Sequence, residues 1–339
     1  MQEPSSQQQA YWDGIADHFG TDRQSSTWRA YMQQCYTALA DRWFTGTPEG
    51  LTLKTDLFEE AVTPLHLFGA LGQNAVGMDL SLAVVRAASE RLRRERNTTH
   101  APPLAVSDLR TLPFANHSVA RILSGSSLDH FERHHDIAVA LAELVRCLRP
   151  GGCLVVTFDN PHNPLVWLRN ALPFSWLTRI GLVPYFVGAT YSRADARQTL
   201  TALGLEVTHV GSMGHVPRAP AIWASDWYAR RSNSVSPLLL RLFGWWDRWL
   251  NDTPLQFRSG YYLAVRAIKP LDAATTVPVR PSDLSAAPPP PPPQGQAAAG
   301  EAWPDGRDSV PQSGGRQVQH PPPESRETPY TAAPRRHPP

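Results

Sequence analysis

Ala75-Val76-Gly77-Met78-Asp79-Leu80-Ser81 begins as a short apolar run and then reaches an acid, and similar runs recur along the first half of the chain. Leu104-Ala105-Val106 is followed by Ser107-Asp108, and Cys153 to Phe158 follows a Pro-Gly-Gly sequence. Helical patterns fill the gaps between these runs. Strands that alternate with helices predict βαβ units and a parallel sheet.

The acids that follow these strands indicate where a ligand would bind. In open sheets of this kind, ligands bind beyond the carboxyl ends of the strands. Asp79 and Asp108 are therefore expected on the rim of one crevice. This arrangement suits a nucleoside, with one carboxylate accepting from ribose hydroxyls and the next lying near the base.

The same reading extends along the chain. Strands are expected at 51–54, 75–78, 104–106, 120–124, 154–158, 205–210 and 261–268. Two helices are expected between Tyr11 and Phe44, and others at 61–71 (interrupted by Pro64), 82–96, 137–148 and 193–203. Ser81 is the expected N-cap of the helix at 82–96, and Gly204 the C-cap of the helix at 193–203.

Two longer motifs follow the strand-end acids. Residues 108–114 read D-x-x-x-L-P-F, and residues 143–152 read E-x-x-R-x-L-x-P-G-G. In this order and spacing, the chain from about Leu51 to Phe158 resembles the class I S-adenosylmethionine-dependent methyltransferases of the small-molecule branch (methyltransferase type 11). The resemblance implies an α/β fold: a Rossmann-like, seven-stranded, mostly parallel sheet with helices on both faces and an antiparallel edge hairpin.

The resemblance also implies a cofactor, S-adenosyl-L-methionine, and the residues that would hold it. Asp79 would hold the ribose, with Leu80 beside it, and Asp108 would lie near the adenine, with Leu109 beside it. Ser126, in the loop after the fourth strand, would face the cofactor near its transferred methyl group.

The loop after the first expected strand, which contains Asp56 to Glu60 and which we call the first loop, departs from the family pattern. The family has an acid followed by a G-x-G loop, because glycine lets the backbone approach the cofactor closely. Here Asp56 matches the acid, but Phe58 and Glu60 stand where glycines are expected. Either the loop takes another path, which we favour, or cofactor binding is lost. Glu59 or Glu60 would meet the cofactor's cationic groups, or both are solvated acids at a helix start.

Composition excludes several classes of protein. The net charge is +2 and the sequence pI about 8.5, without a basic block interleaved with aromatic residues, so nucleic acid is not an expected partner. Three cysteines without C-x-x-C spacing indicate neither a disulfide framework nor a zinc site. We find no signal peptide and no apolar run of about 18 residues, so a cytoplasmic protein without a transmembrane segment is expected.

The expected organisation has four parts. Residues 1–9 are expected to be disordered, 10–50 to form an N-terminal helical cap, 51–270 to form the methyltransferase domain, and 271–339 to form a disordered, Pro-rich tail. Insertions at about 160–191 and 214–260 are rich in aromatic and apolar residues. They indicate an apolar or flat acceptor, a peripheral membrane contact, or packing as a subdomain or homodimer interface.

Catalytic candidates follow the fourth and fifth strands. His130 is the candidate general base, because its ordinary pKa lies near neutrality, and Asp129 would orient it. The alternative is a polar loop that leads into the next helix. Asn160 and His162 are candidates for substrate contact or for a structural turn. The spacing of His130, His134 and His135 fits no known metal-ligand pattern, so no metal is expected.

Two function classes remain open on the sequence. The first is methyl transfer to an unidentified small-molecule or lipid-like acceptor. The second is a degenerate methyltransferase fold that acts as a non-catalytic binding or scaffolding protein. The altered first loop favours the second class, and the retained acids and aromatic insertions favour the first.

Overall fold

The computed structural model describes residues 4–19, 26–63, 67–96, 101–179, 187–232 and 234–272. Its strands form one seven-stranded sheet in the order β3-β2-β1-β4-β5-β7-β6. Their bounds are β1 Thr52–Thr55, β2 Ala75–Asp79, β3 Leu104–Val106, β4 Val119–Gly125, β5 Leu148–Asp159, β6 Glu206–Met213 and β7 Tyr262–Ile268. The strands β1 to β5 pair in parallel, and β7 pairs antiparallel with both β5 and β6. The predicted fold class and antiparallel edge are confirmed.

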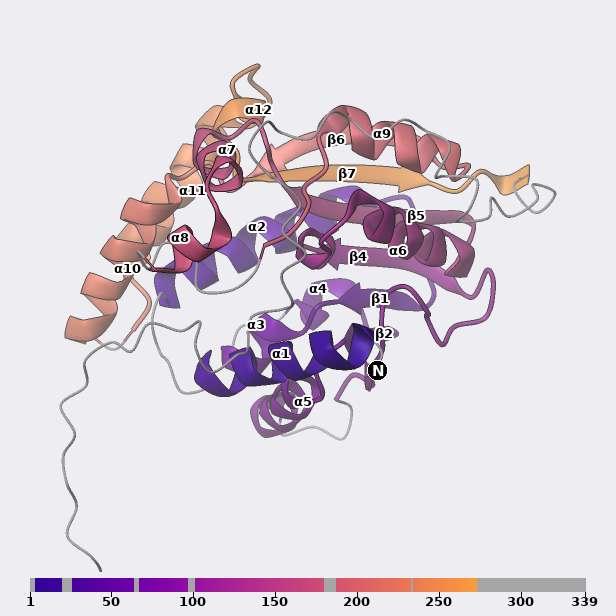
Figure 1. Cartoon of the computed structure of the whole chain (residues 1–339), viewed down its shortest axis with the longest axis horizontal. Coiled ribbons are helices and arrows are strands. Elements are labelled where there is room, and N and C mark those ends of the chain that lie inside the picture. The colour runs from indigo at the N-terminus through magenta and orange to yellow at the C-terminus, as the bar shows by residue number, and fades with distance from the viewer. Residues whose placement is uncertain are drawn as a thin grey trace, which may run out of the picture.

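Helices cover both faces of the sheet (Figure 1). Their bounds are α1 Pro4–Phe19, α2 Ser26–Phe44, α3 Phe58–Val62, α4 Phe68–Leu71, α5 Leu82–Arg96, α6 His134–Cys147, α7 Pro164–Ala171, α8 Phe174–Arg179, α9 Arg193–Ala202, α10 Arg218–Ser232, α11 Pro237–Leu250 and α12 Gln256–Ser259, with a 3-10 turn η1 at Leu128–His130. The helix at 82–96 was predicted with these bounds, and the Val84 N–H donates to Oγ of its cap Ser81 at 3.1 Å.

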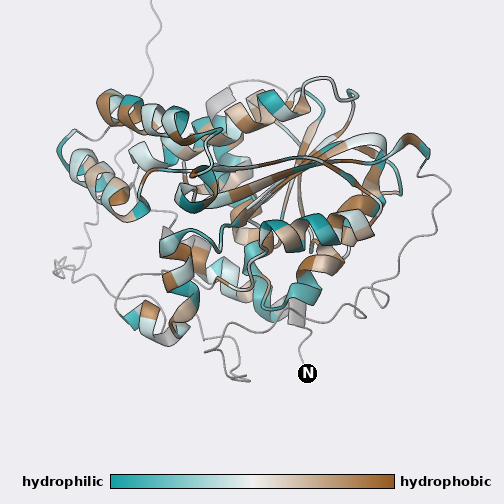
Figure 2. Ribbon diagram, turned by 90° about the horizontal axis from the view of Figure 1, so that it is seen from above, coloured by the Kyte–Doolittle hydropathy of each residue, from teal (hydrophilic) through white to brown (hydrophobic). Residues whose placement is uncertain are grey.

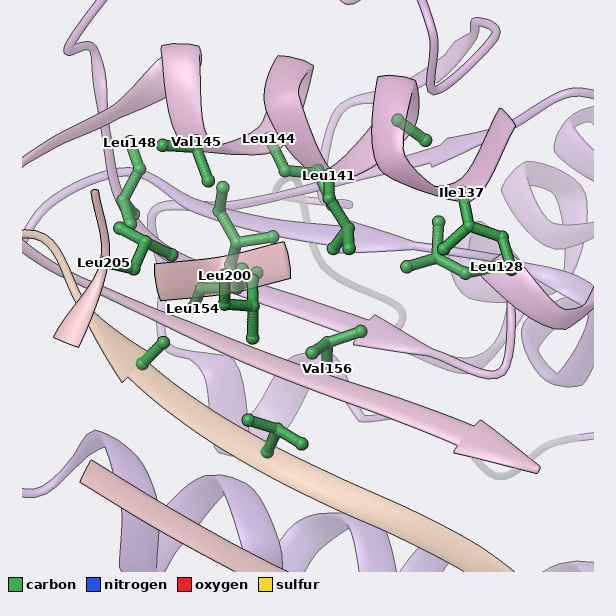
Figure 3. Packing of buried hydrophobic residues seen from close by; sticks show 14 of the residues in the cluster. Leu128, Ile137, Leu141, Leu144, Val145, Leu148, Leu154, Val156, Leu200 and Leu205 are labelled. Carbon is green, nitrogen blue, oxygen red and sulfur yellow. The ribbon is translucent and has the colours of Figure 1, made fainter. Parts of the chain in front are cut away.

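Strand β5 contributes alternate residues to two hydrophobic cores, one on each face of the sheet. Leu154 and Val156 belong to the cluster that also contains residues of α6 and α9, whereas Cys153 and Val155 belong to the cluster that contains residues of α2 and α5. This alternation follows from the two-residue period of a strand. The strands are brown, and so apolar, over much of their length between the helical layers (Figure 2). Figure 3 shows α6 packed on the first cluster. Each fully buried leucine or valine contributes about 1.5–3 kcal/mol.

The structure corrects three predicted boundaries. Helix α1 begins at Pro4, so residues 4–9 are helical rather than disordered. The predicted helix at 61–71 is two short helices, α3 and α4, and Pro64 itself lies outside the described residues. Strand β5 begins at Leu148, so the Pro-Gly-Gly sequence lies inside the strand, where its register with β4 shifts.

Three other predictions concern the C-terminal tail, the two insertions and the absence of a transmembrane segment. The predicted disordered tail, 271–339, lies outside the described residues except for Leu271 and Asp272. The insertions form α7 and α8 after β5, and α10, α11 and α12 before β7. Among the helices of the described ranges, none combines the length and the apolar character needed to cross a membrane.

At Gly152 in β5, the surrounding atoms leave no room for a side chain. A Cβ there would lie 2.8 Å from the Arg149 carbonyl oxygen, 2.8 Å from Leu148 Cδ1 and 2.9 Å from the Ala120 carbonyl oxygen. We expect Gly152→Ala to lower the free energy of unfolding by about 1–3 kcal/mol, because two of these neighbours are backbone atoms that cannot turn away. Denaturant unfolding measures this.

The matched control is Gly69→Ala in α4, where an added Cβ would meet no atom within 4 Å. Its free energy of unfolding should change by less than about 1 kcal/mol. Equal effects of the two substitutions would contradict the packing argument.

Candidate active site

One large cavity, of about 730 Å³, lies beyond the carboxyl ends of the parallel strands. Its size is typical of pockets for small ligands and cofactors. Residues after β1, β2, β3 and β4 line one part of it, and residues of α2, α7 and α10 line another. Of the residues proposed from the sequence, those at the cavity are Asp56, Glu59, Glu60, Asp79, Leu80, Asp108, Leu109, Ser126, Asp129 and His130.

Asp79, at the end of β2, joins the first loop to helix α5. Its Oδ2 accepts from the Leu57 N–H at 2.9 Å, and its Oδ1 accepts from the Ser81 N–H at 2.9 Å. Burial, and then the nearby charge of Asp56, raises the pKa of this carboxyl to about 7. A carboxylate oxygen can accept more than one hydrogen bond. Asp79 can therefore accept from ribose hydroxyls while it keeps both backbone contacts.

The first loop takes its turn at Asp56 rather than at a glycine. Asp56 has a φ of 70°, and its Oδ1 accepts from the Phe58 N–H at 2.7 Å. Lys54, buried on β1, donates to the Asp56 carbonyl oxygen and, at 2.9 Å, to Glu60. Aspartate tolerates the left-handed region better than most residues with a Cβ. The loop is thus held by side chains on a path of its own.

Glu60 is part of this support rather than a free carboxylate. It is 1% exposed, and it accepts from Lys54 and from the Leu67 N–H at 3.3 Å. Glu59 is exposed and pairs with Arg29 of α2 at 2.6 Å. Of the two acids, Glu59 is the one reached from outside the loop, and its partner Arg29 also lines the cavity.

Asp108 is held by an arginine from its own motif. Arg110 donates to both carboxylate oxygens of Asp108, with Nε to Oδ1 at 3.0 Å and Nη2 to Oδ2 at 2.6 Å. The same Nη2 donates to Gln8 of α1 at 3.1 Å. Such two-pronged pairing is among the stronger charge-assisted contacts. It compensates the charge of Asp108 and ties α1 to the rim of the crevice.

Helix α1 closes one side of the cavity. Asp13 accepts from the Ser81 hydroxyl and from the Ala83 N–H at 3.0 Å, so it binds the start of α5. The Trp12 ring packs edge-on against the ring of His130, with 4.5 Å between centroids. Trp12 lines the cavity, whereas Tyr11 is a buried core residue. His130 is therefore positioned by α1 as well as by its own turn.

Asp129 is bonded to the end of β5. Its Oδ2 accepts from the Asp159 N–H at 2.9 Å. The side chain is 1% exposed. Burial, and then the charge of Asp159, raises the pKa of Asp129 well above its usual range. Asp129 fixes the start of the loop after β5 and presents a protonatable carboxyl to the cavity.

Asn160 and His162 do not line the cavity. The Asn160 side chain donates to the Phe257 and Gly260 carbonyl oxygens, each at 2.8 Å, and accepts from the His162 N–H at 3.1 Å. His162 is exposed and lies at a separate small depression. Their position after β5 reflects a structural role that fastens the loop to α12.

Sequence reasoning missed the cavity residues contributed by α2, α7, α10 and β7. Tyr36 donates to, or accepts from, the Thr157 hydroxyl at 3.1 Å, and Arg169 forms a buried ion pair with Asp159. Arg218 lies 4.7 Å from the centre of the Tyr261 ring. For Arg169 and Arg218, the only signal was their position in the two insertions, and no local motif marks Tyr36 or Tyr261.

No group of three or more His, Cys, Asp or Glu side chains in the described ranges is arranged to hold a metal ion. His134 and His135 lie on the exposed start of α6, where the His134 ring contacts the Thr190 carbonyl oxygen at 3.0 Å. The three-histidine sequence therefore separates into one cavity residue and two surface residues.

The raised pKa of Asp79 makes stability depend on pH. An unfolded aspartate has a pKa of about 3.9, whereas Asp79 in the folded chain has a pKa of about 7. Between these values the unfolded chain has released a proton that the folded chain still holds. The contribution of protonated Asp79 to the free energy of unfolding is therefore complete below pH of about 4, and it is lost as the pH rises to about 7.

Asp56→Asn tests this dependence, because it removes the neighbouring negative charge while an amide oxygen can still accept from the Phe58 N–H. We expect its free energy of unfolding to fall less between pH of about 4 and 7, by on the order of 1 kcal/mol. Denaturant unfolding across this range measures the difference. The exposed control Asp41→Asn should follow the wild-type curve, and an identical slope in Asp56→Asn would contradict the coupling.

Comparisons with known proteins agree with this geometry. Residues 61–156 match a family model described as a methyltransferase domain. The chain is 29% identical over 175 residues to the demethylmenaquinone methyltransferase of Thermobifida fusca, covering 51% of this chain and 68% of that protein. It is 36% identical over 134 residues to the uncharacterized protein YafE of Escherichia coli, covering 33% and 60%.

Other matches are shorter or more distant. The chain spans 32% of an uncharacterized chloroplastic methyltransferase of Arabidopsis thaliana and 44% of the demethylmenaquinone methyltransferase of Protochlamydia amoebophila. Among solved structures, the geranyl diphosphate C-methyltransferase of Streptomyces coelicolor aligns with a TM-score of 0.43 and 16% identity, over 70% of this chain and 77% of that one. Taken with the seven-stranded sheet and the strand-end acids, the family match identifies the chain as carrying a class I S-adenosylmethionine-dependent methyltransferase domain.

Proposed function

We propose that this chain transfers a methyl group from S-adenosylmethionine to a small-molecule or lipid-like acceptor. One observation carries the proposal: a single cavity joins the strand-end acids Asp79 and Asp108 to His130 and to apolar side chains of both insertions. A donor and an acceptor placed in one cavity react without a separate encounter.

In this proposal, Asp79 accepts hydrogen bonds from the ribose, and Leu80 and Leu109 line the nucleoside part of the cavity. S-adenosylmethionine supplies an electrophilic methyl carbon next to a sulfonium. Glu59 is the exposed acid nearest the loop and offers negative charge toward the cationic end of the cofactor. The Phe58 ring, with the Arg29 guanidinium 5.8 Å from its centre, covers this part of the cavity.

The acceptor part of the cavity has apolar walls and a few charged groups. Apolar contact comes from Leu165, Leu168 and Ile222. The buried ion pair of Arg169 and Asp159 offers polar atoms at a fixed position. In the proposed reaction, the acceptor's nucleophilic atom would bond to the methyl carbon while the methyl–sulfur bond breaks and S-adenosylhomocysteine leaves, and His130 would take the proton of that nucleophilic atom. Asp129, whose pKa is raised, is the second candidate for this role.

The alternative is a non-catalytic binding or scaffolding protein. Two observations favour it: Arg110 already occupies both carboxylate oxygens of Asp108, and the first loop has side chains where the family has glycines. Calorimetric titration of the full chain with S-adenosylmethionine separates the two functions. Binding supports methyl transfer, and failure to bind at millimolar cofactor supports the alternative.

Asp79→Ala tests the cofactor assignment. Because a hydrogen bond to a charged group contributes about 1.5–3 kcal/mol, affinity for S-adenosylmethionine should fall about tenfold or more. Calorimetric titration gives the dissociation constant, and the exposed control Asp41→Ala should match the wild type. A thermal unfolding scan of each variant shows whether the first loop, which Asp79 also holds, remains folded. A folded Asp79→Ala with unchanged affinity would exclude Asp79 as the ribose ligand.

His130→Ala tests the proposed base. Loss of a general base should lower turnover by about 10²–10⁴ while cofactor affinity changes little. The acceptor can be sought among quinones, polyprenyl lipids, sugars and phenols with a radiolabelled methyl donor. His135→Ala, at an exposed position of α6, is the matched control. Full turnover in His130→Ala from pH 6 to 9 would transfer the role to Asp129, which Asp129→Asn then tests.

A further inference from the structure

The insertions expose an unusual number of large apolar side chains at one end of the molecule. We call this surface the tryptophan face and define it by Trp167, Trp176, Trp223, Trp227, Leu238, Leu242, Trp245 and Trp249. Trp167 is 63% exposed, Trp223 66% and Trp249 61%. The elements that carry these residues, α7, α8, α10 and α11, lie together at the left of Figure 1. Isolated exposed tryptophans are ordinary, but a group on neighbouring helices indicates an interaction site.

Helix α11 presents an apolar stripe outward. Leu238, Leu242, Trp245 and Trp249 are spaced by four, three and four residues, so they lie on one side of the helix. The rings of Trp245 and Trp249 stack with 6.1 Å between centroids and 1° between planes. On the opposite side, Phe243, Asp247 and Leu250 are buried.

The outward direction of this stripe is fixed by a buried carboxylate. Asp247 accepts from the Tyr31 hydroxyl of α2 and from the His215 N–H at 2.9 Å. Phe243 packs with Trp28, Tyr31, Val216 and Ala221 in a cluster that joins α2, α10 and α11. Rotating α11 to bury its tryptophans would break these hydrogen bonds and expose Phe243. The apolar stripe is therefore built into the fold.

Arginines border the tryptophan face. Arg230 and Arg231 are exposed at the end of α10, and Arg241 and Arg248 are exposed along α11. Arg231 lies 3.9 Å from the centre of the Trp227 ring. Of the two acids on these helices, Asp247 is buried and Asp226 lines the cavity. The border of the face is thus positively charged.

We propose that the tryptophan face docks on the surface of an anionic phospholipid bilayer. Tryptophan is favoured at the level of lipid headgroups, because its ring is apolar and its indole N–H is polar. Arginines near an anionic membrane surface contribute attraction. A second copy of the chain fits this face less well, since two-fold contact would bring the arginine borders of both copies together.

Two helices contribute to both the face and the cavity. Leu165 and Leu168 of α7 line the cavity wall, as do Ala219 and Ile222 of α10, and Trp167 and Trp223 lie on the same two helices. Docking through this face would bring these two helices, and with them the cavity wall, to the bilayer. The acceptor would then be a membrane lipid or an apolar molecule dissolved in the membrane, an extension that rests on the proposed methyl transfer.

Vesicle co-sedimentation of the full chain tests the docking without any need for activity. The chain should pellet with vesicles of phosphatidylcholine that contain about one third phosphatidylglycerol, and much less with phosphatidylcholine alone. The double variant Arg241→Ala/Arg248→Ala should bind the anionic vesicles at least tenfold more weakly, since each arginine near the surface changes partitioning about fivefold. Trp245→Ser/Trp249→Ser should lose about tenfold or more.

Matched controls and a second measurement make the outcome decisive. Arg86→Ala/Arg93→Ala on α5 removes two exposed arginines outside the face and should bind as the wild type does. Thermal unfolding of every variant excludes loss of fold, and lipids brominated on their chains should quench the wild-type tryptophan fluorescence.

Equal binding of the wild type and both face variants would overturn the proposal, as would absence of binding to anionic vesicles. A dimer in sedimentation velocity that the tryptophan variant abolishes would instead assign the face to self-association. Because neither vesicle binding nor quenching requires S-adenosylmethionine, a chain that docks but does not bind the cofactor would refute only the proposed methyl transfer.

Discussion

The carboxylate of Asp79 is the contact on which the crevice depends. It accepts from Leu57 in the loop after β1 and from Ser81 at the start of α5, so one side chain fixes three segments that meet at the end of β2. These bonds lie in a buried, acid-rich setting that raises the pKa of Asp79. Burying acids close together lowers the stability of the fold, and groups with strongly shifted pKa values concentrate at functional sites. This supports a role for Asp79 beyond holding the fold.

The first loop illustrates how a family feature can be replaced by other means. Glycines would allow the tight turn by conformational freedom, whereas here Asp56 adopts a positive φ and Lys54 donates to its carbonyl oxygen. Glu60 compensates the buried charge of Lys54. The loop is thus held by an ion pair and by the contact of Lys54 with the Asp56 carbonyl oxygen.

The two insertions contribute both cavity residues and exposed apolar residues. Their inner residues, such as Leu168 and Ile222, complete the cavity, and their outer residues form the tryptophan face. The hydrogen bonds of Asp247 set which side of α11 is buried, and they leave its tryptophans on the outer surface.

Local periodicity and the acids at strand ends were enough to predict the succession of strands, the helix at 82–96 and the positions of Asp79 and Asp108. Long-range packing decided the rest. The contact of Arg110 with Gln8 and the support of His130 by Trp12 depend on how α1 docks. The sequence left Asn160 open between substrate contact and a structural turn, because its partners, the Phe257 and Gly260 carbonyls, lie about a hundred residues away in the chain. The hydrophobic pattern of α11 marks an amphipathic helix, but only the tertiary contacts of Asp247 decide that its tryptophans face outward.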